Sequence, residues 1–228
     1  MFRRTVARLV RGVWLITVLS PSLATAQRVP AAAPAPEVGF EPNVGQFDAT
    51  VQFASRGRGY TLFLTDSDAV MAVGGVDGQA VVRMALERGR PVRGEGRSRQ
   101  RTTVNYLRGT RTSWRTDVPT YARVAFADAA PGVDLVFYGR QGGHEYDLIV
   151  GEGVDPAGAT LRFSGADRLA LEPDGALSVV TTAGTIRMKS PLAYQEIAGV
   201  RRAVPARYVV NEARVGFALE NTTRPHPW

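Results

Sequence analysis

An all-β fold, one antiparallel β-sandwich or two packed together and built from hairpins and meanders, is predicted by two features of this 228-residue sequence. Short runs with period-two alternation, such as YTLFL at residues 60–64 and EYDLIV at residues 145–150, recur between residues 40 and 220. No window longer than about ten residues has a helical apolar period with caps at both ends. We therefore expect few or no helices beyond an N-terminal leader.

The first 26 residues have the pattern of an export leader. A basic region precedes the apolar run Val13–Leu19, and residues 24–26 (ATA) place small side chains where a signal peptidase cleaves. The run is far shorter than the ~20 residues that cross a bilayer, and Pro21 interrupts it. We predict cleavage after Ala26. The mature chain would then have no transmembrane segment and would lie in the periplasm, at the cell surface or outside the cell.

The rest of the chain is predicted to contain a linker, a large folded region and a tail. Residues 27–39 are rich in proline and alanine, which favours an extended spacer. Strand-like runs fill residues 40–220, which form one all-β domain or two packed sub-sandwiches, and residues 221–228 form a disordered or truncated tail. The chain has no cysteine, so its stability comes from an apolar core and not from disulfides.

The charge balance argues against nucleic acid as a partner. Four of the 28 basic residues lie in the leader, which leaves the mature chain with a formal charge of +3. The segment 87–101 is an exception, because it contains six arginines, two carboxylates and no apolar period. We interpret it as a solvated loop between two strands. The alternative is a patch that binds an acidic polysaccharide or a lipid head group.

Turn signals link neighbouring strands in the C-terminal half. The Pro-Asp-Gly sequence at residues 173–175 combines a preset dihedral angle, a side-chain acceptor and a residue that accepts positive φ. Ala-Gly at residues 183–184 and at residues 198–199 is placed to turn the chain in the same way. We predict a meander of four consecutive strands, whose apolar face is buried by a second sheet or by its own curvature.

The stretch GGHEYDLIV, residues 142–150, contains the sharpest catalytic candidates. Alternation along a strand places Glu145 and Asp147 on one face, and Asp134 of the preceding strand joins them in one register. Side chains two residues apart lie roughly 6–7 Å from each other, which overlaps the spacing of paired glycosidase carboxylates. The interpretation we favour is a solvated strand face whose acids pair with arginines. We therefore expect no catalytic residues and no enzymatic activity.

Neither a metal site nor a cofactor site is predicted. The two histidines, His144 and His226, have no second ligand motif near them, whereas a closed zinc site needs four nitrogen or sulfur ligands. Neither a G-x-S-x-G motif nor a phosphate-binding loop between a strand and a helix is present.

Aromatic and basic side chains remain as candidates for ligand binding. Tryptophan and tyrosine rings can stack on a sugar, but they more often fill a sandwich core with the polar atom at its edge. The candidates are Trp114, Tyr121, Tyr138, Tyr146, Arg97 and Arg99.

Three segments contain the landmarks of a known family. Residues 40–73 open with F-x-x-N-x-G-Q, residues 104–167 contain W-x-x-x-V-P-x-Y, P-G-x-D-L and E-Y-D, and residues 191–210 contain P-x-A-Y-Q. Over residues 40–217 the chain resembles the domain of unknown function that precedes SBBP repeats, the β-propeller repeats of large exported bacterial proteins. The resemblance implies no established activity.

The resemblance also implies roles for several motif residues. Asn43 and Gly45 suit a turn after the linker, and Trp114 and Tyr121 bracket Pro119 in a packed corner. The family pattern continues past residue 217 into a further strand and the propeller repeats, whereas this chain ends in LENTTRPHPW. It is then a truncated product or a free-standing copy, and loss of that strand could expose a sheet edge.

The function expected from these features is that of a non-catalytic structural or interaction module of a secreted or cell-surface bacterial protein. The first alternative is a module that binds a carbohydrate or surface polymer, and the partners considered are surface polysaccharides and other surface proteins. The second alternative is a glycoside hydrolase that uses Glu145 and Asp147.

Overall fold

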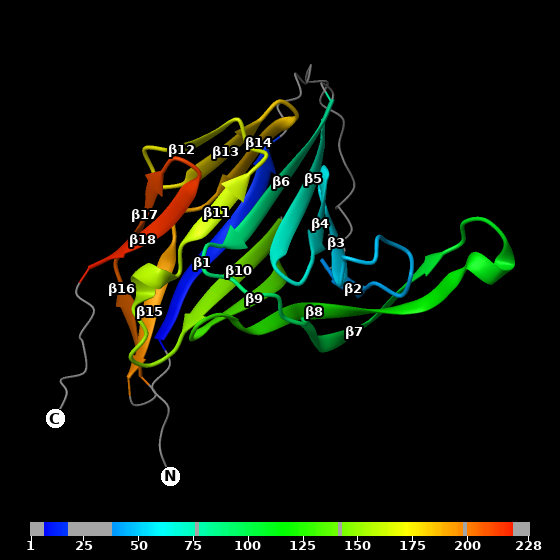
Figure 1. Ribbon diagram of the computed structural model, residues 1–228, viewed down its shortest axis with the longest axis horizontal. Helices are drawn as coiled ribbons and strands as arrows, with labels where there is room; N and C mark the ends of the chain where they lie inside the picture. Colours follow the sequence, from blue (N-terminus) through cyan, green and yellow to red (C-terminus); the bar gives the residue numbers. More distant parts are fainter. Residues whose placement is uncertain (1–6, 18–37, 76–77, 141–142, 198–199, 221–228) are drawn as a thin grey trace, which may run out of the picture.

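The computed structural model describes residues 7–17, 38–75, 78–140, 143–197 and 200–220, and for residues 7–17 it describes only the backbone. Two antiparallel sheets pack face to face as a β-sandwich, and a two-stranded hairpin extends away from it (Figure 1). The all-β prediction is confirmed. The only helices in the described residues are two 3₁₀ turns, η1 (Arg111–Ser113) and η2 (Pro156–Gly158).

The larger sheet has ten strands. They are β1 (Ala7–Thr17), β7 (Glu95–Tyr106), β8 (Arg115–Ala130), β9 (Val133–Arg140), β10 (Gly143–Val150), β12 (Arg168–Leu171), β13 (Leu177–Thr181), β14 (Gly184–Met188), β15 (Leu192–Ile197) and β16 (Val200–Val204). Their order is β12-β13-β14-β1-β10-β9-β8-β7, with β15 paired to β1 and β16 paired to β15.

The smaller sheet has eight strands. They are β2 (Glu41–Pro42), β3 (Phe53–Gly57), β4 (Tyr60–Leu64), β5 (Asp68–Gly75), β6 (Gly78–Leu86), β11 (Leu161–Ser164), β17 (Ala206–Asn211) and β18 (Arg214–Leu219). Their order is β17-β18-β11-β6-β5-β4-β3-β2.

Alternation along the strands produces the core between the sheets. In β4, Tyr60, Leu62 and Leu64 are buried and the residues between them are half-buried. Leu148 of β10 and Leu177 of β13, in the opposite sheet, belong to the same apolar cluster. Burial of this apolar surface supplies the main driving force for folding, since the chain has no cysteine.

The turns expected at residues 173–175 and 183–184 connect strands as predicted, and Gly184 has φ +138° between β13 and β14. The turn expected at residues 198–199 lies outside the described residues. Gly175 has φ +79° and its N–H donates to the carbonyl of Glu172 over 2.9 Å, which closes the turn between β12 and β13. Residues 131–132 (Pro-Gly) link β8 to β9, with Gly132 at φ +71°. Positive φ at these positions suits glycine because other residues are strained there.

The predicted meander of four consecutive strands is only partly right. β12, β13 and β14 pair in order, but β15 pairs with β1 and β16 instead of β14. The apolar run VPARYVV at residues 204–210 is divided between β16 and β17 at Pro205, which has no N–H to donate to a ladder. The chain passes there from the larger sheet to the smaller one.

The segment 87–101, expected as a loop, is a loop only in its first part. β7 begins at Glu95 and pairs with β8, so the second part of the segment belongs to the larger sheet. The expected corner around Pro119 is also wrong, because Pro119 lies within β8 opposite Thr103. Neighbouring strands therefore accommodate more arginine and proline than strand propensity suggests.

Residues 7–17, within the predicted leader, form strand β1. Its backbone pairs with β10 along one edge and with β15 and then β14 along the other. Cleavage after Ala26 stays a prediction, and it would remove this strand from the sheet. At the other end of the described chain, β18 is paired on both sides, with β17 and β11, and β17 lies at the edge of the smaller sheet.

Candidate functional site

The three carboxylates singled out in the sequence lie on one face of the larger sheet. Glu145 is opposite Tyr138 and Asp147 is opposite Val136, while Asp134 is opposite Ile149, two positions further along β10. Period-two alternation therefore directs all three acids to the same side. The register that gathers them is thus present.

Each of these acids already has a structural partner. Asp147 accepts a hydrogen bond from the Tyr138 hydroxyl over 2.9 Å, and Asp134 accepts one from the Asp128 N–H over 2.6 Å, where β8 bulges. Glu145 is 4% exposed, and its Oε2 lies 3.9 Å from Nε of Arg140. The expectation that Glu145 faces water is therefore wrong. The two hollows characterised on the described surface are lined by other residues.

His144, the neighbour of these acids, lies on the opposite face of β10 in the core. Its Nε2 is 2.7 Å from the Ser55 Oγ, and its Nδ1 is 2.5 Å from the Tyr60 hydroxyl. The His144 backbone N–H also donates to that hydroxyl over 3.2 Å. Ser55 Oγ in turn donates to the Gly39 carbonyl over 2.7 Å. We call Ser55, Tyr60 and His144 the core polar chain.

The donors and acceptors of the core polar chain fix one arrangement of protons. The Ser55 hydroxyl donates its hydrogen to the Gly39 carbonyl, so its oxygen accepts a hydrogen bond from His144 Nε2–H. In the neutral imidazole Nδ1 then has no proton, and it accepts a hydrogen bond from the Tyr60 hydroxyl. Burial lowers the pKa of His144 to about 4 and raises the pKa of Tyr60 to about 12. Both groups are therefore neutral at neutral pH. Each polar side-chain atom of the core polar chain has a hydrogen-bond partner.

A serine within hydrogen-bond distance of a histidine also resembles a nucleophile and its base. Here Ser55 and His144 are each 1% exposed, and the Ser55 hydrogen is already donated to a carbonyl. Tyr60 borders a hollow of about 440 Å³ over β4–β6, but neither Ser55 nor His144 lines it. The geometry therefore supports a tie between the two sheets, from β3 and β4 to β10.

The sequence analysis missed the core polar chain. It regarded His144 only as a possible metal ligand, and it did not consider Ser55. One signal was available: His144 lies on the same face of β10 as Tyr146, Leu148 and Val150, which are all fully buried. Its partners, however, lie 84 and 89 residues away in sequence, and no local pattern identifies them.

The aromatic candidates do not form a common platform. Tyr146 is fully buried, and burial raises its pKa well above the usual value. The Tyr121 ring packs edge-on against Phe53, with centroids 6.3 Å apart. Tyr138 is 8% exposed and bonded to Asp147, while Trp114 lies beyond η1 with the Arg111 guanidinium 5.6 Å from its ring centroid. These four rings thus serve separate packing roles.

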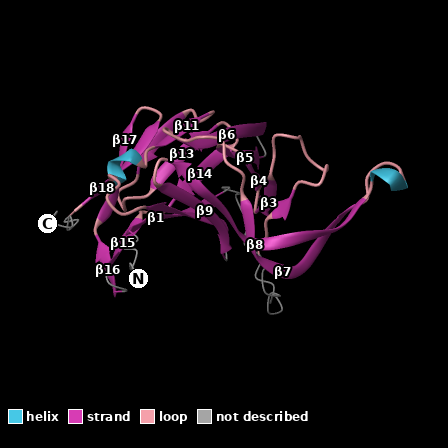
Figure 2. Ribbon diagram, turned by 60° about the horizontal axis from the view of Figure 1, so that its bottom comes forward, coloured by secondary structure: helices cyan, strands magenta, loops and turns pink. Residues whose placement is uncertain are grey.

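The remaining candidates, Arg97 and Arg99, lie at the start of the projecting hairpin. We call residues 97–117 the arm; it contains the outer parts of β7 and β8 and the connection with η1. Both views show it extending away from the sandwich, with η1 at its tip (Figures 1 and 2). Arg97 pairs with Glu95 over 2.9 Å, whereas Arg99 has no carboxylate within ion-pair distance among the described residues.

A cluster of hydrogen bonds around the buried carboxylate of Glu41 anchors the arm to the sandwich. Glu41 of β2 is 2% exposed, and its Oε1 accepts from Arg56 Nη1 over 2.5 Å and from the Tyr106 hydroxyl over 2.7 Å. Arg56 Nη2 donates to the same hydroxyl over 2.6 Å. Burial raises the pKa of Tyr106 to about 12, so its hydroxyl keeps its proton. Charge-assisted bonds of this kind are stronger than neutral ones.

The loop between β2 and β3 braces the same region. Asn43 organises this loop: its Nδ2 donates to the carbonyls of Asp48 and Val51 over 2.8 and 2.9 Å, and its Oδ1 accepts from the Gly45 N–H over 3.0 Å. Gly45 has φ +100°, as a turn there requires. From the arm, Arg115 Nε donates to the Val44 carbonyl over 2.9 Å. An isolated hairpin is only marginally stable, so these contacts hold the arm in place.

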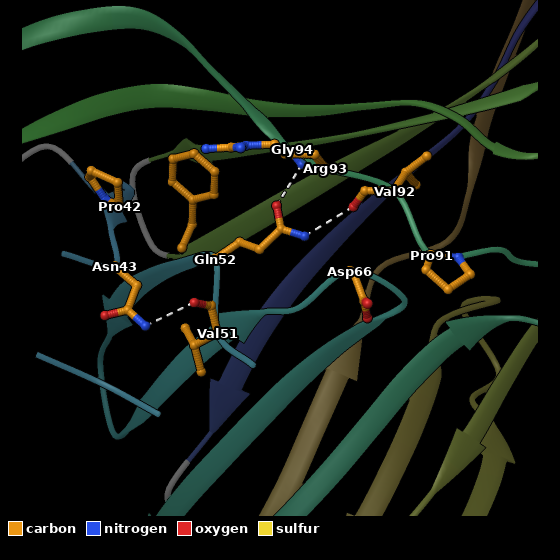
Figure 3. A pocket seen from close by; sticks show the side chains of 10 residues that line it. Pro42, Asn43, Val51, Gln52, Asp66, Pro91, Val92, Arg93 and Gly94 are labelled. Carbon is orange, nitrogen blue, oxygen red and sulfur yellow. Dashed lines mark hydrogen bonds between the residues drawn. The ribbon is translucent and has the colours of Figure 1, made fainter. Parts of the chain in front are cut away.

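A hollow of about 560 Å³ lies at the root of the arm (Figure 3). Gln52 lies within it, donating to the Val92 carbonyl over 3.0 Å and accepting from the Gly94 N–H over 2.7 Å. Asp66 and Arg93 also line the hollow, and both are exposed. The hollow therefore offers one negative and one positive side chain, while the side-chain amide of Gln52 is already hydrogen-bonded to the backbone.

The described residues show no arrangement of three or more His, Cys, Asp or Glu side chains that could hold a metal ion. Nor does any helix in the described part of the chain have the length and apolar character needed to span a bilayer.

Comparison with known proteins yields one match. A family model described as a domain of unknown function, DUF7948, matches residues 40–227. No curated protein and no solved structure matches the chain. The matched range includes both sheets apart from β1, the core polar chain and the arm.

Proposed function

Since the chain belongs to the DUF7948 family of domains of unknown function, we propose that it is a non-catalytic interaction module of an exported bacterial protein, in which the sandwich is a scaffold and the arm makes the contact. The observation that carries this proposal is the arm itself: a two-stranded projection tied to the sandwich by the Glu41–Arg56–Tyr106 cluster. A preorganised projection loses little conformational entropy on binding.

Export is supported by the leader pattern of residues 1–26. The resemblance to the domain that precedes SBBP repeats supports a place beside a β-propeller in longer proteins. Cleavage after Ala26 would remove β1 and leave the facing edges of β10 and β14 without this partner. Sequencing the N-terminus of the chain secreted by a bacterial host should find Gln27, and an uncleaved chain retained in the cytoplasm would refute the export proposal.

The contact role is tested by shortening the arm. Replacing residues 105–117 by Asn-Gly joins Val104 to Val118, its partner in the ladder, through a two-residue hairpin turn. We expect wild-type protein to be retained on a bacterial envelope preparation and the shortened protein to lose most of that retention. Glu41 keeps its ion pair with Arg56, and a circular dichroism spectrum checks that the shortened protein is folded. Equal retention of both proteins would contradict the proposal.

The hydrolase alternative has a test of its own. If Glu145 and Asp147 were catalytic, Glu145→Gln and Asp147→Asn would abolish the release of soluble sugars from the envelope preparation. We expect no such release by the wild-type protein, because Asp147 is bonded to Tyr138 and Glu145 is buried outside either hollow. Release that both substitutions remove would establish an enzyme in place of a binding module.

The second candidate function is binding of a surface polymer, and the arginines of the arm favour it. The arm contains six arginines and a single carboxylate, Asp117. A local excess of one charge on a projecting element attracts ligands of the opposite charge.

A further inference from the structure

The arginines around the arm fall into two groups. Arg90 forms an ion pair with Asp128, and Arg97 forms one with Glu95. The Arg111 guanidinium lies over the Trp114 ring. Four others are exposed and have neither a carboxylate within ion-pair distance nor an aromatic ring against the guanidinium among the described residues: Arg93 at the hollow, Arg99 and Arg101 on β7, and Arg108 near the tip of the arm. We call these four the free arginines.

The free arginines follow the length of an extended element. Three of them lie on the arm, and Arg93 precedes β7 by two positions and lines the hollow at the root. Adjacent strand residues are roughly 3.3 Å apart, so the charges are spread along the strand direction and not gathered on one compact patch. A long, narrow ligand that carries repeated negative charges matches this distribution.

The neighbouring side chains narrow the class of ligand. Ser98, Thr102, Thr103 and Asn105 are exposed on the same strand and offer hydroxyl and amide groups, which suit sugar hydroxyls. Leu107 is the only large hydrophobic side chain exposed on the arm, which is little for insertion into a lipid surface. The Tyr106 ring already has the Arg56 guanidinium over it, 5.5 Å from its centroid, and the Trp114 ring has that of Arg111 at 5.6 Å, which argues against a platform for stacking nucleic-acid bases.

We propose that the free arginines bind an acidic polysaccharide, with its carboxylate groups on the guanidinium groups of β7 and the arm tip and its chain passing the hollow at Arg93. This inference rests on the proposed function and specifies its partner. A guanidinium presents paired N–H donors that match both oxygens of a carboxylate. Asp66, which also lines the hollow, supplies an acceptor for sugar hydroxyls.

The test measures binding of the full chain to polygalacturonate, with dextran as the neutral comparison, by isothermal titration calorimetry. In the test variant, Arg93, Arg99, Arg101 and Arg108 are changed to Gln. The matched control has the same loss of charge at four exposed arginines of the sandwich that also have no carboxylate within ion-pair distance among the described residues: Arg162, Arg168, Arg202 and Arg207. We expect polygalacturonate to bind wild type about 10-fold more tightly than the test variant, while the control stays within about 2-fold of wild type.

Two further measurements, with added salt and with lipid vesicles, complete the test. Raising the ionic strength from about 0.05 M to about 0.3 M should weaken wild-type binding several-fold, because screening acts on exposed charges. An equal loss of affinity for polygalacturonate in the test variant and the control would show that only the net charge matters, and it would overturn the inference. So would equal binding of dextran, no binding of polygalacturonate, or binding only to vesicles that contain phosphatidylglycerol.

Retention of the variants on the envelope preparation distinguishes a failure of this inference from a failure of the proposed function. If the test variant stays on the envelope preparation while the shortened arm does not, the arm is a contact element for another ligand, and only the polysaccharide assignment falls. If shortening the arm has no effect on retention, the proposed function falls with it.

Discussion

The core polar chain and the arm treat polar side chains in opposite ways. In the core polar chain every donor meets an acceptor, all groups are neutral, and Ser55 and His144 are each 1% exposed. The four free arginines, three on the arm and Arg93 at its root, are charged and exposed, and they have no carboxylate partner among the described residues. Saturated, buried polar groups stabilise one structure, whereas unsaturated, exposed ones remain available to a ligand. The contrast locates the scaffold and the contact surface in different parts of one chain.

The largest expected effect comes from acid, which should break the core polar chain alone. His144 has a pKa of about 4 in the folded protein against 6.5 in the unfolded chain, owing to burial. The unfolded state therefore binds more protons between these values. The stability contribution is fully present above pH ~6.5 and is lost as the pH falls toward ~4, by on the order of 3 kcal/mol. Urea unfolding at a series of pH values measures it.

The comparison for this titration uses both histidines. A His144→Gln protein, which has no imidazole in the core, should show a smaller fall in the free energy of unfolding over the same pH range. His226 lies outside the described residues, and His226→Gln should leave the fall unchanged. Identical pH profiles for wild type and His144→Gln would show that the buried imidazole does not control acid stability.

A smaller effect is expected when one link of the core polar chain is removed without a change of charge. Tyr60→Phe takes away the hydroxyl that donates to His144 Nδ1 and accepts from the His144 N–H. Two buried polar groups then lack a partner, which should lower the free energy of unfolding by about 2 kcal/mol. Thermal or urea unfolding gives the value. The matched control, Tyr194→Phe, removes the hydroxyl of a half-buried tyrosine that makes no side-chain hydrogen bond within the described residues, and it should change stability little.

The smallest effect on stability is expected at the root of the arm. It also separates the arm most clearly from the core polar chain. Tyr106→Phe removes one of two donors to Glu41, which retains its ion pair with Arg56. We expect a loss of about 1 kcal/mol in global stability. Amide exchange should accelerate in residues 99–117 while β10 stays protected, because local opening depends on local contacts. Uniform acceleration over both regions would show that the arm and the sandwich unfold as one unit.

Strand positions and turns could be predicted from local patterns, and much of the candidate surface could not. Alternation identified β4, β9 and β10, and glycine at residues 175 and 184 marked turns that the structure contains. Arg97 and Arg99 were proposed for ligand binding, but their segment was interpreted as a loop. Only the pairing of β7 with β8 shows that they belong to a braced, projecting hairpin.

By itself, the sequence determined the all-β class, the positions of most strands and the side of each strand that is apolar, because these depend on neighbours within a few residues. The tertiary structure alone decided the switch of sheets at Pro205, the pairing of β11 with β6, and the meeting of Ser55 with His144 across 89 residues. Such partners are chosen by the packing of the whole core, in which many apolar strands compete for each edge. No local pattern records the outcome of that competition.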